Sequence, residues 1–189
     1  MKPLLLLIAF LGLLCFEDYS QTISAEGTYS LALKEDGSIV AWGNINEYTE
    51  FSRWSWQTGV VAISAGEWHS LALKEDGSVV ALGRNNQGQL NVPSGLTGVV
   101  AISAGELHSL ALKDDGTAVV WGRNGNEKLN VPEGLTGVVA ISAGKWHSLA
   151  LKEDGSVVAW GKNTDGQLNV PEGLTGVVAI SAGKQHSLA

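Results

Sequence analysis

The sequence predicts an all-β fold, specifically a β-propeller of four-stranded antiparallel blades, and three observations lead to this prediction. The string I-S-A-G-x-x-H-S-L-A recurs with a step of 39 residues, beginning at Ile63, Ile102, Ile141 and Ile180. Each unit contains four apolar segments of strand length, separated by Gly, Asn, Asp-Gly and Pro, which is the composition of strands and turns. Four antiparallel strands in about 40 residues is the size of one propeller blade.

The segments of a unit follow in a constant order. They read VVAISAG, HSLALK, an E/D-D-G-S/T turn, a V-V-A-W-G-like run, N-x-x-G-Q-L-N-V-P and x-G-L-T-G. The Asp-Gly pair supplies the positive φ that a tight hairpin needs. Runs such as Val60-Val61-Ala62-Ile63 are apolar at consecutive positions, so both faces of each sheet should be covered by stacked neighbours. A parallel β-helix or another solenoid is the alternative, although such coils are usually shorter and lack so regular a hairpin.

The repeats are expected to occupy residues 23–189. The predicted units span 23–62, 63–101, 102–140 and 141–179, with a partial unit at 180–189, which makes about four and a quarter blades. An open arc of blades leaves apolar faces exposed, which favours association. We therefore expect either a fragment of a longer protein, forming part of a seven-bladed ring, or an oligomer if the chain ends at Ala189.

Residues 1–20 are predicted to be a signal peptide. Lys2 precedes an apolar run from Leu4 to Phe16, which is too short to span a bilayer but suits the apolar region of a secretory signal. No A-x-A triplet marks a cleavage site. The prediction is a secreted, periplasmic or cell-surface protein without membrane association after signal removal. A hydrophobic N-terminal strand or a membrane anchor is the alternative for this segment.

Composition and motifs exclude several classes of function. The formal net charge is −7 and there is no run of Lys or Arg, so we expect no nucleic-acid partner. Cys15 is the one cysteine, which excludes disulfide frameworks, cysteine-bound zinc and thiol catalysis. No phosphate loop, G-x-S-x-G or H-E-x-x-H motif occurs. We therefore expect no catalytic residue, no metal and no cofactor.

The repeat pattern resembles one known family. The pattern A-G-x-x-H-S-L-A-L-K-x-D-G-x-V-x-A-W-G-x-N-x-x-G-Q-L is similar to the regulator of chromosome condensation repeat, from about Ile23 to Ala189. That resemblance implies a propeller that usually has seven blades. Short blades behind a signal peptide are most similar to the exported subgroup of β-lactamase inhibitor proteins. Guanine-nucleotide exchange is not expected, because this chain shows no insertion comparable to the wedge of the exchange factors.

Two sets of repeated residues are assigned structural roles. The histidine position is expected to bond a neighbouring backbone group through its imidazole, and the Trp before Gly is expected to pack between blades. The first set is His69, His108, His147 and His186, with Tyr29 in the first unit, and the second is Trp42, Trp121 and Trp160, with Leu82 in the second unit.

The connections between strands separate a constant face from a variable one. Connection 2–3 is nearly identical in every unit, whereas connections 1–2 and 3–4 differ and carry exposed aromatic residues, which protein interfaces concentrate. The candidate partner-binding residues are Trp68, Trp146, Leu107, Gln185, Tyr48, Trp54 and Trp56. Packing at a blade edge is the alternative role for Trp68 and Trp146, and packing against whatever closes the ring is the alternative for Trp54 and Trp56.

The predicted function is that of an exported, non-enzymatic propeller that binds another protein through its variable face. By resemblance, the partner is a secreted enzyme that the propeller inhibits. The alternatives are a propeller enzyme, a lyase or hydrolase with its site at the channel mouth, and a carbohydrate-binding module.

Overall fold

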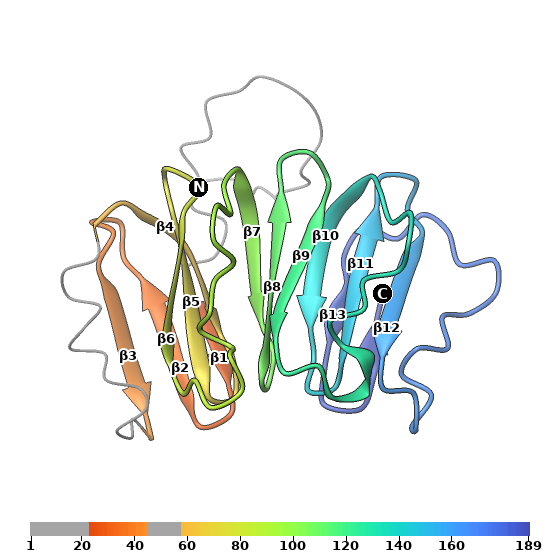
Figure 1. The fold of residues 1–189 in the computed structure, drawn as a ribbon, viewed down its shortest axis with the longest axis horizontal. Helices are drawn as coiled ribbons and strands as arrows, with labels where there is room; N and C mark the ends of the chain where they lie inside the picture. The colour runs from red at the N-terminus through yellow and green to blue at the C-terminus, as the bar shows by residue number, and fades with distance from the viewer. Residues whose placement is uncertain (1–22, 45–57) are drawn as a thin grey trace, which may run out of the picture.

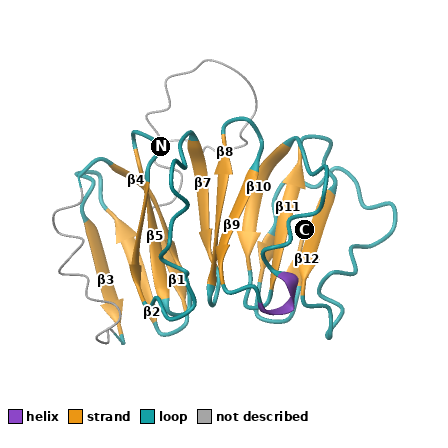
Figure 2. Ribbon diagram, in the orientation of Figure 1, coloured by secondary structure: helices purple, strands orange, loops and turns teal. Residues whose placement is uncertain are grey.

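The computed structural model describes residues 23–44 and 58–189. The predicted signal peptide and Cys15 lie outside these described residues. Figures 1 and 2 show short strands joined by tight loops, and Figure 2 shows the 3-10 turn η3 (Gly125–Glu127) in purple. No described helix is long and apolar enough to cross a membrane. The all-β prediction is confirmed.

Four three-stranded antiparallel sheets follow one another along the chain. Within each sheet the middle strand pairs with both neighbours, so the strands form a simple meander. The sheets are β1 (Ile23–Glu26), β2 (Tyr29–Leu33) and β3 (Ile39–Gly43); β4 (Val60–Ala65), β5 (His69–Lys74) and β6 (Val79–Gly83); β7 (Val99–Ala104), β8 (His108–Lys113) and β9 (Ala118–Gly122); and β10 (Val138–Ala143), β11 (His147–Lys152) and β12 (Val157–Gly161). A two-stranded sheet of β13 (Ser181–Ala182) and β14 (Ser187–Leu188) follows.

The predicted fourth strand is not formed as a strand in the second, third and fourth units, and residues 84–98 show why. Asn85 Oδ1 accepts a hydrogen bond from the Leu90 amide at 2.9 Å, and Asn85 Nδ2 donates to Asn91 Oδ1 at 2.9 Å. Pro93 adds a position that has no amide hydrogen for a strand ladder. The N-x-x-G-Q-L-N-V-P motif therefore folds into turns that bond to themselves, and each sheet has three strands.

The sheets stack face to face in an arc (Figure 1). Strands β1, β4, β7, β10 and β13 pack against one another in that order. Three apolar clusters fill the spaces between sheets, and their central side chains, Leu31, Ile63, Leu71 and Leu110, are fully buried. Burial of this kind supplies most of the favourable free energy of folding. Stacking explains why the strands are apolar at consecutive positions.

A serine of the I-S-A-G segment joins each sheet to the next. Ser64 Oγ accepts a hydrogen bond from the Ala104 amide at 3.0 Å. Ser24, Ser103 and Ser142 accept equivalent bonds from Ala65, Ala143 and Ala182, each at 2.9 Å. The amide at the end of each first strand thus has a partner in the preceding repeat.

The repeated histidine makes the second bond between sheets. His69 Nε2 lies 2.8 Å from Ser109 Oγ, and that hydroxyl donates its hydrogen to the Gln89 carbonyl at 3.0 Å. The hydroxyl must therefore accept from His69, so Nε2 carries the imidazole proton. The same contact joins His108 to Ser148 and His147 to Ser187, each at 3.0 Å.

The structural role expected for the histidines is confirmed for His69, His108 and His147, but the predicted partner is wrong. The imidazole bonds a serine hydroxyl of the next repeat rather than a backbone group. Tyr29 bonds in both ways, because its hydroxyl donates to the His69 carbonyl at 2.8 Å and lies 2.7 Å from Ser70 Oγ. Burial raises the pKa of Tyr29 to about 12.

The glycine of the A-G-x-x-H motif is required by two neighbours at once. A Cβ on Gly105 would lie 2.5 Å from the Gly144 carbonyl oxygen and 2.5 Å from His108 Cε1. Equivalent close approaches occur at Gly66, where the nearest atom is the Gly105 oxygen, and at Gly144, where it is the Gly183 oxygen. The motif keeps Gly because adjacent backbones and the buried imidazole occupy the space of a side chain.

The tryptophan of the third strand also reaches the preceding repeat. Trp121 Nε1 donates to the Gln89 carbonyl and Trp160 Nε1 to the Lys128 carbonyl, both at 2.9 Å, and both side chains are 5% exposed. The predicted packing between sheets is confirmed for these two. Trp42 is 48% exposed, since the described residues include no sheet on that side of β3.

We expect Gly105→Ala to destabilise the fold by about 1–3 kcal/mol, the usual cost of overpacking a dense interior. The φ of Gly105 is not in the left-handed region, so the loss would come from crowding alone. Gly125→Ala is the matched control, because its nearest atoms belong to the flexible side chain of Arg123. Chemical denaturation measures both variants. Equal stabilities would contradict the steric argument.

The histidine contacts predict a loss of stability in mild acid. Burial lowers the pKa of His69 to about 4 in the folded chain, whereas an unfolded histidine titrates near 6.5. The unfolded chain therefore binds more protons between these values, and the free energy of unfolding should fall as pH falls from about 6.5 to about 4.

Thermal unfolding across this pH range measures that effect. The variant His69→Gln should show a shallower dependence, and the comparison separates the histidine from Glu106, whose raised pKa acts in the opposite direction. Identical slopes in the two proteins would refute the assignment.

Candidate functional site

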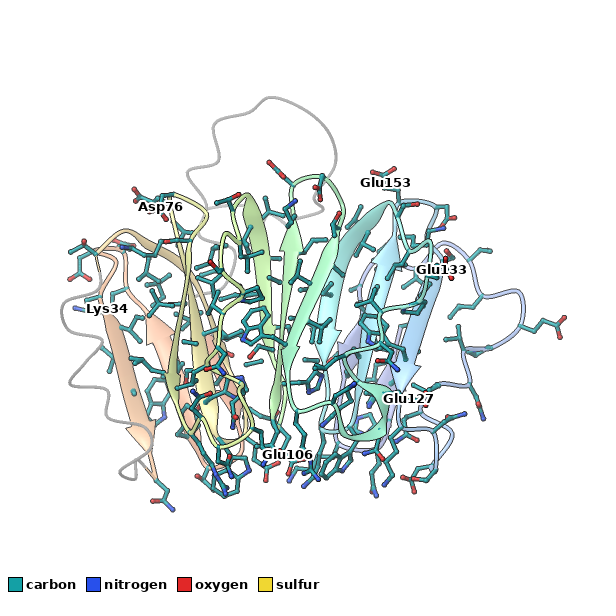
Figure 3. All side chains as sticks on the ribbon, in the orientation of Figure 1. Lys34, Asp76, Glu106, Glu127, Glu133 and Glu153 are labelled. Atoms are coloured by element: carbon teal, nitrogen blue, oxygen red, sulfur yellow. The ribbon has the colours of Figure 1, made fainter. Side chains whose placement is uncertain are left out.

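The two ends of the stacked sheets differ in chemistry. One end, the hairpin face, carries the turns at residues 34–38, 74–78, 113–117 and 152–156. The other, the variable face, carries the turns at 66–68, 105–107, 144–146 and 183–185 together with the loops that begin at 84, 123 and 162. In Figure 3, Asp76 and Glu153 mark the hairpin face along the upper edge, and Glu106 lies on the variable face along the lower edge.

The hairpin face repeats one exposed arrangement. Asp36 Oδ1 accepts the Ser38 amide at 2.9 Å, and Lys34 Nζ lies 3.1 Å from Asp36 Oδ2. The hydroxyl and amide of Ser38, followed by Lys34, lower the pKa of Asp36 to about 2. These carboxylates are exposed and serve the turn. The hydrogen bonds of the turn thus hold the pKa of Asp36 below its ordinary value, away from the range of a general acid.

The variable face carries four of the predicted partner-binding residues. Trp68 and Trp146 are partly exposed and Gln185 is exposed. Leu107 is buried, with 8% of its surface exposed, so it offers a partner little area. Tyr48, Trp54 and Trp56 lie outside the described residues. The assignment of all seven to a partner surface stays a prediction.

A charged group lies where the turns of the variable face converge. Lys145 Nζ is 3.6 Å from Glu67 Oε2 and 3.5 Å from Glu106 Oε1, so one ammonium group bridges carboxylates of two other repeats. Burial raises the pKa of Glu106, and Lys145 opposes that shift. The Glu67 amide also donates to the Gly105 carbonyl at 3.3 Å, which fixes the turn that carries the carboxylate.

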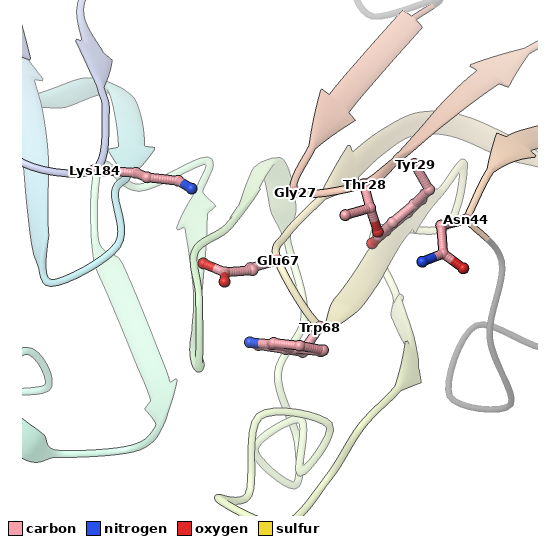
Figure 4. A pocket seen from close by; sticks show the side chains of 7 residues that line it. All are labelled: Gly27, Thr28, Tyr29, Asn44, Glu67, Trp68 and Lys184. Atoms are coloured by element: carbon pink, nitrogen blue, oxygen red, sulfur yellow. The ribbon is translucent and has the colours of Figure 1, made fainter.

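Trp68 lines a small cavity of about 130 Å³ beside this group. Figure 4 shows Lys184 and Glu67 approaching it from one side and Asn44 from the other. Arg84 lies over the indole, with its guanidinium carbon 5.4 Å from the ring centroid. Gly27, Thr28 and Tyr29 complete the lining. Residues of the first, second and last repeats thus line one cavity.

Positively charged side chains gather around the indole ring of Trp146. Four positive groups lie around its indole ring, at 4.7 Å for Lys128 Nζ, 5.3 Å for Lys145 Nζ, 5.8 Å for the Arg123 guanidinium and 5.9 Å for Lys162 Nζ. Each contact lies within the range of a cation–π interaction. We call these four side chains the cationic cluster.

Lys128 was missed by the sequence analysis. It replaces the glutamine found at positions 89 and 167, whose side-chain oxygen accepts the amide of Gln87 or Asp165 at 2.9 Å. A lysine has no acceptor, so the loop takes the η3 turn instead, with positive φ at Asn126 and Glu127. The replacement of that glutamine by lysine is the feature of the sequence that could have identified Lys128.

The side chain of Lys128 is fully buried. Its ammonium group has no hydrogen-bond acceptor among the described residues. Burial lowers its pKa to about 8, an effect that the nearby Glu106 carboxylate partly opposes.

The described residues do not form a metal centre. No three His, Cys, Asp or Glu side chains among residues 23–44 and 58–189 come together in a way that could hold an ion. The histidines instead lie one per repeat, each bonded to the following repeat.

This architecture is that of a β-propeller whose blades are joined by bonds between equivalent residues. The family model of the regulator of chromosome condensation (RCC1) repeat matches three segments, residues 60–89, 99–127 and 138–167. The chain belongs to the RCC1 repeat family.

Solved structures share the fold. Prp20p from Saccharomyces cerevisiae superposes with a TM-score of 0.67 at 22% identity, covering 87% of this chain and 54% of that one. The CRINKLY WD40 ectodomain of the Arabidopsis thaliana receptor kinase ACR4 gives 0.66 at 24% identity, with 86% and 55% covered. Human WBSCR16 gives 0.64 at 18% identity, with 91% and 58% covered.

This chain therefore spans little more than half the length of these solved proteins. No curated protein sequence matches it.

We expect Lys128→Gln to stabilise the protein, because the glutamine of the other repeats would satisfy the loop amide and remove a buried charge. The folded pKa near 8 lies below the value of 10.5 for an ordinary lysine, so the wild-type stability should rise with pH between these values. Thermal unfolding should show a higher Tm for the variant and no such rise. Lys152→Gln on the hairpin face is the charge-matched control, and an unchanged profile in Lys128→Gln would contradict the burial argument.

Proposed function

We propose that this protein is an exported, non-enzymatic propeller that binds another protein through its variable face. One observation carries the proposal. The bonds that hold the repeats together use the same residue types in each repeat, whereas the partly exposed aromatic and charged residues of the variable face differ from one repeat to the next. Rigid scaffolds that present variable loops with aromatic side chains are typical of binding proteins.

The solved relatives agree with a binding role. Prp20p is described by its binding properties to Gsp1p and histones. A second structure, which has 25% identity and a TM-score of 0.65, shows Kap60 bound to yeast RCC1 (Prp20). These partners belong to those proteins. For this chain, the apolar segment at 4–16 favours export, so the partner we propose is a secreted protein, and inhibition of a secreted enzyme is the activity that the resemblance to exported inhibitors favours.

The constant residues argue against catalysis at this surface. The buried histidines each use Nε2 for the contact with the next repeat, and the exposed carboxylates of the hairpin face serve turns. A propeller enzyme or a carbohydrate-binding module would need a pocket with converging polar groups. The cavity beside Trp68 is small, and its one carboxylate, that of Glu67, is paired with Lys145.

Substitution of Trp68 and Trp146 by Ala tests the proposal. If these residues anchor the partner, each change should weaken capture of a partner protein by about 2 kcal/mol or more, roughly 30-fold in Kd, while the fold stays intact. Immobilised protein and secreted proteins from the same source provide the assay, with the isolated partner titrated afterwards. Asp76→Asn on the hairpin face is the control. Capture unchanged in the double variant would refute a partner site on the variable face.

A further inference from the structure

The cationic cluster is the least explained feature of the variable face. Lys145 and Lys162 come from the same repeat as Trp146, and Arg123 and Lys128 come from the preceding one. Four positive charges within 6 Å of one ring centroid repel one another. This concentration stands out in a chain whose formal net charge is −7.

The carboxylates nearby neutralise only part of the cluster. Glu67 and Glu106 both pair with Lys145. Within the described part of the chain, Arg123, Lys128 and Lys162 form no ion pair. Glu106 acts on Lys128 through space without a hydrogen bond. Two negative groups thus face four positive ones, and the cluster keeps an excess of positive charge.

Lys128 carries the least compensated charge of the cluster. An ammonium group donates up to three hydrogen bonds, and burying one without acceptors costs free energy. Lys128 Nζ is buried beside Trp146 without an acceptor from the described residues. The neighbouring repeats place a glutamine there, so the lysine is not needed to fold the loop.

We propose that the cationic cluster binds a carboxylate of the partner protein, with the exposed Arg123 donating to the carboxylate, the buried Lys128 attracting it through space, and Trp146 packing against the adjoining chain. This inference rests on the proposed function and names the chemistry of the partner as a short acidic segment. An extended polyanion such as a nucleic acid fits less well, because Glu67 and Glu106 border the cluster and the chain has no further basic run. Glutamate or aspartate side chains offer one compact negative group beside apolar atoms, which matches a ring of cations around an indole.

A peptide probe tests the inference without knowledge of the partner. N-acetylated, amidated octaglutamate is titrated into the ¹⁵N-labelled protein, with octaglutamine as the neutral match, and the indole N–H signals are followed. The Trp146 signal is assigned from its loss in Trp146→Phe. We expect octaglutamate to shift the Trp146 signal and octaglutamine to leave it in place.

Two charge-removing variants decide the result. Arg123→Gln should weaken octaglutamate binding by roughly tenfold or more, as expected for loss of a hydrogen bond to a charged group. Lys152→Gln removes the same charge from the hairpin face and should leave the affinity unchanged. The inference is overturned if octaglutamate does not shift the Trp146 signal, if both peptides shift it equally, or if Arg123→Gln and Lys152→Gln bind alike.

The outcomes distinguish a failure of this inference from a failure of the proposed function. Loss of partner capture in the tryptophan variants, combined with a negative peptide result, would keep the protein-binding role and discard the acidic partner. Peptide binding with unchanged capture would place a carboxylate site on a face that the partner does not use, and would overturn the proposal that this site serves the partner.

Discussion

The hydrogen bond between the His or Tyr of one repeat and the serine of the next is the contact on which the rest of the structure depends. It lies inside the apolar stack, where an unpaired polar group would be costly, so it sets how each sheet aligns with its neighbour. Ser109 shows how much converges there, since it meets His69 and also donates to the carbonyl of Gln89. Strand and loop of one repeat are thereby tied to a single side chain of the next.

This arrangement separates the residues that hold the protein together from those that a partner would meet. The serine, histidine and glycine positions lie between sheets and are repeated with little change. The second residue after that glycine lies in the turns of the variable face, and this position holds Trp68, Leu107, Trp146 and Gln185, of which Leu107 is buried. Substitution on the variable face therefore leaves the bonds between sheets in place. Lys128 belongs to neither group, because it is buried like a structural residue yet carries a charge that the fold does not need.

Local patterns made most of the fold predictable. The step of the repeat, the Asp-Gly hairpins and the first three strands of each unit can be identified from short sequence segments, and the structure contains them. The fourth strand was predicted wrongly because apolar content does not reveal that Asn85 bonds to Leu90 and Asn91 and so competes with a strand ladder. The histidine's partner could not be foreseen either, since it lies 40 residues away and depends on how two sheets align.

The candidate site was predictable only in outline. Exposed aromatics on variable turns could be identified from the repeat, and Trp68 and Trp146 do lie there. The cationic cluster could not, because it joins Arg123 and Lys128 to a tryptophan of the following repeat. The replacement of a glutamine by Lys128 is visible in the sequence, but its burial depends on contacts between repeats.

The bond from Trp121 or Trp160 to the preceding loop makes the contacts of a repeat with its predecessor different from those with its successor. Trp121 holds the carbonyl of Gln89, and Trp160 holds that of Lys128, so the loop of one repeat is anchored by its successor. A binding loop and the residue that supports it therefore belong to different units of the sequence. Duplication or exchange of a single unit would separate the two, whereas a unit moved together with its successor would keep its surface. Adjacent pairs, rather than single repeats, are the smallest pieces in which such a surface can be inherited or engineered.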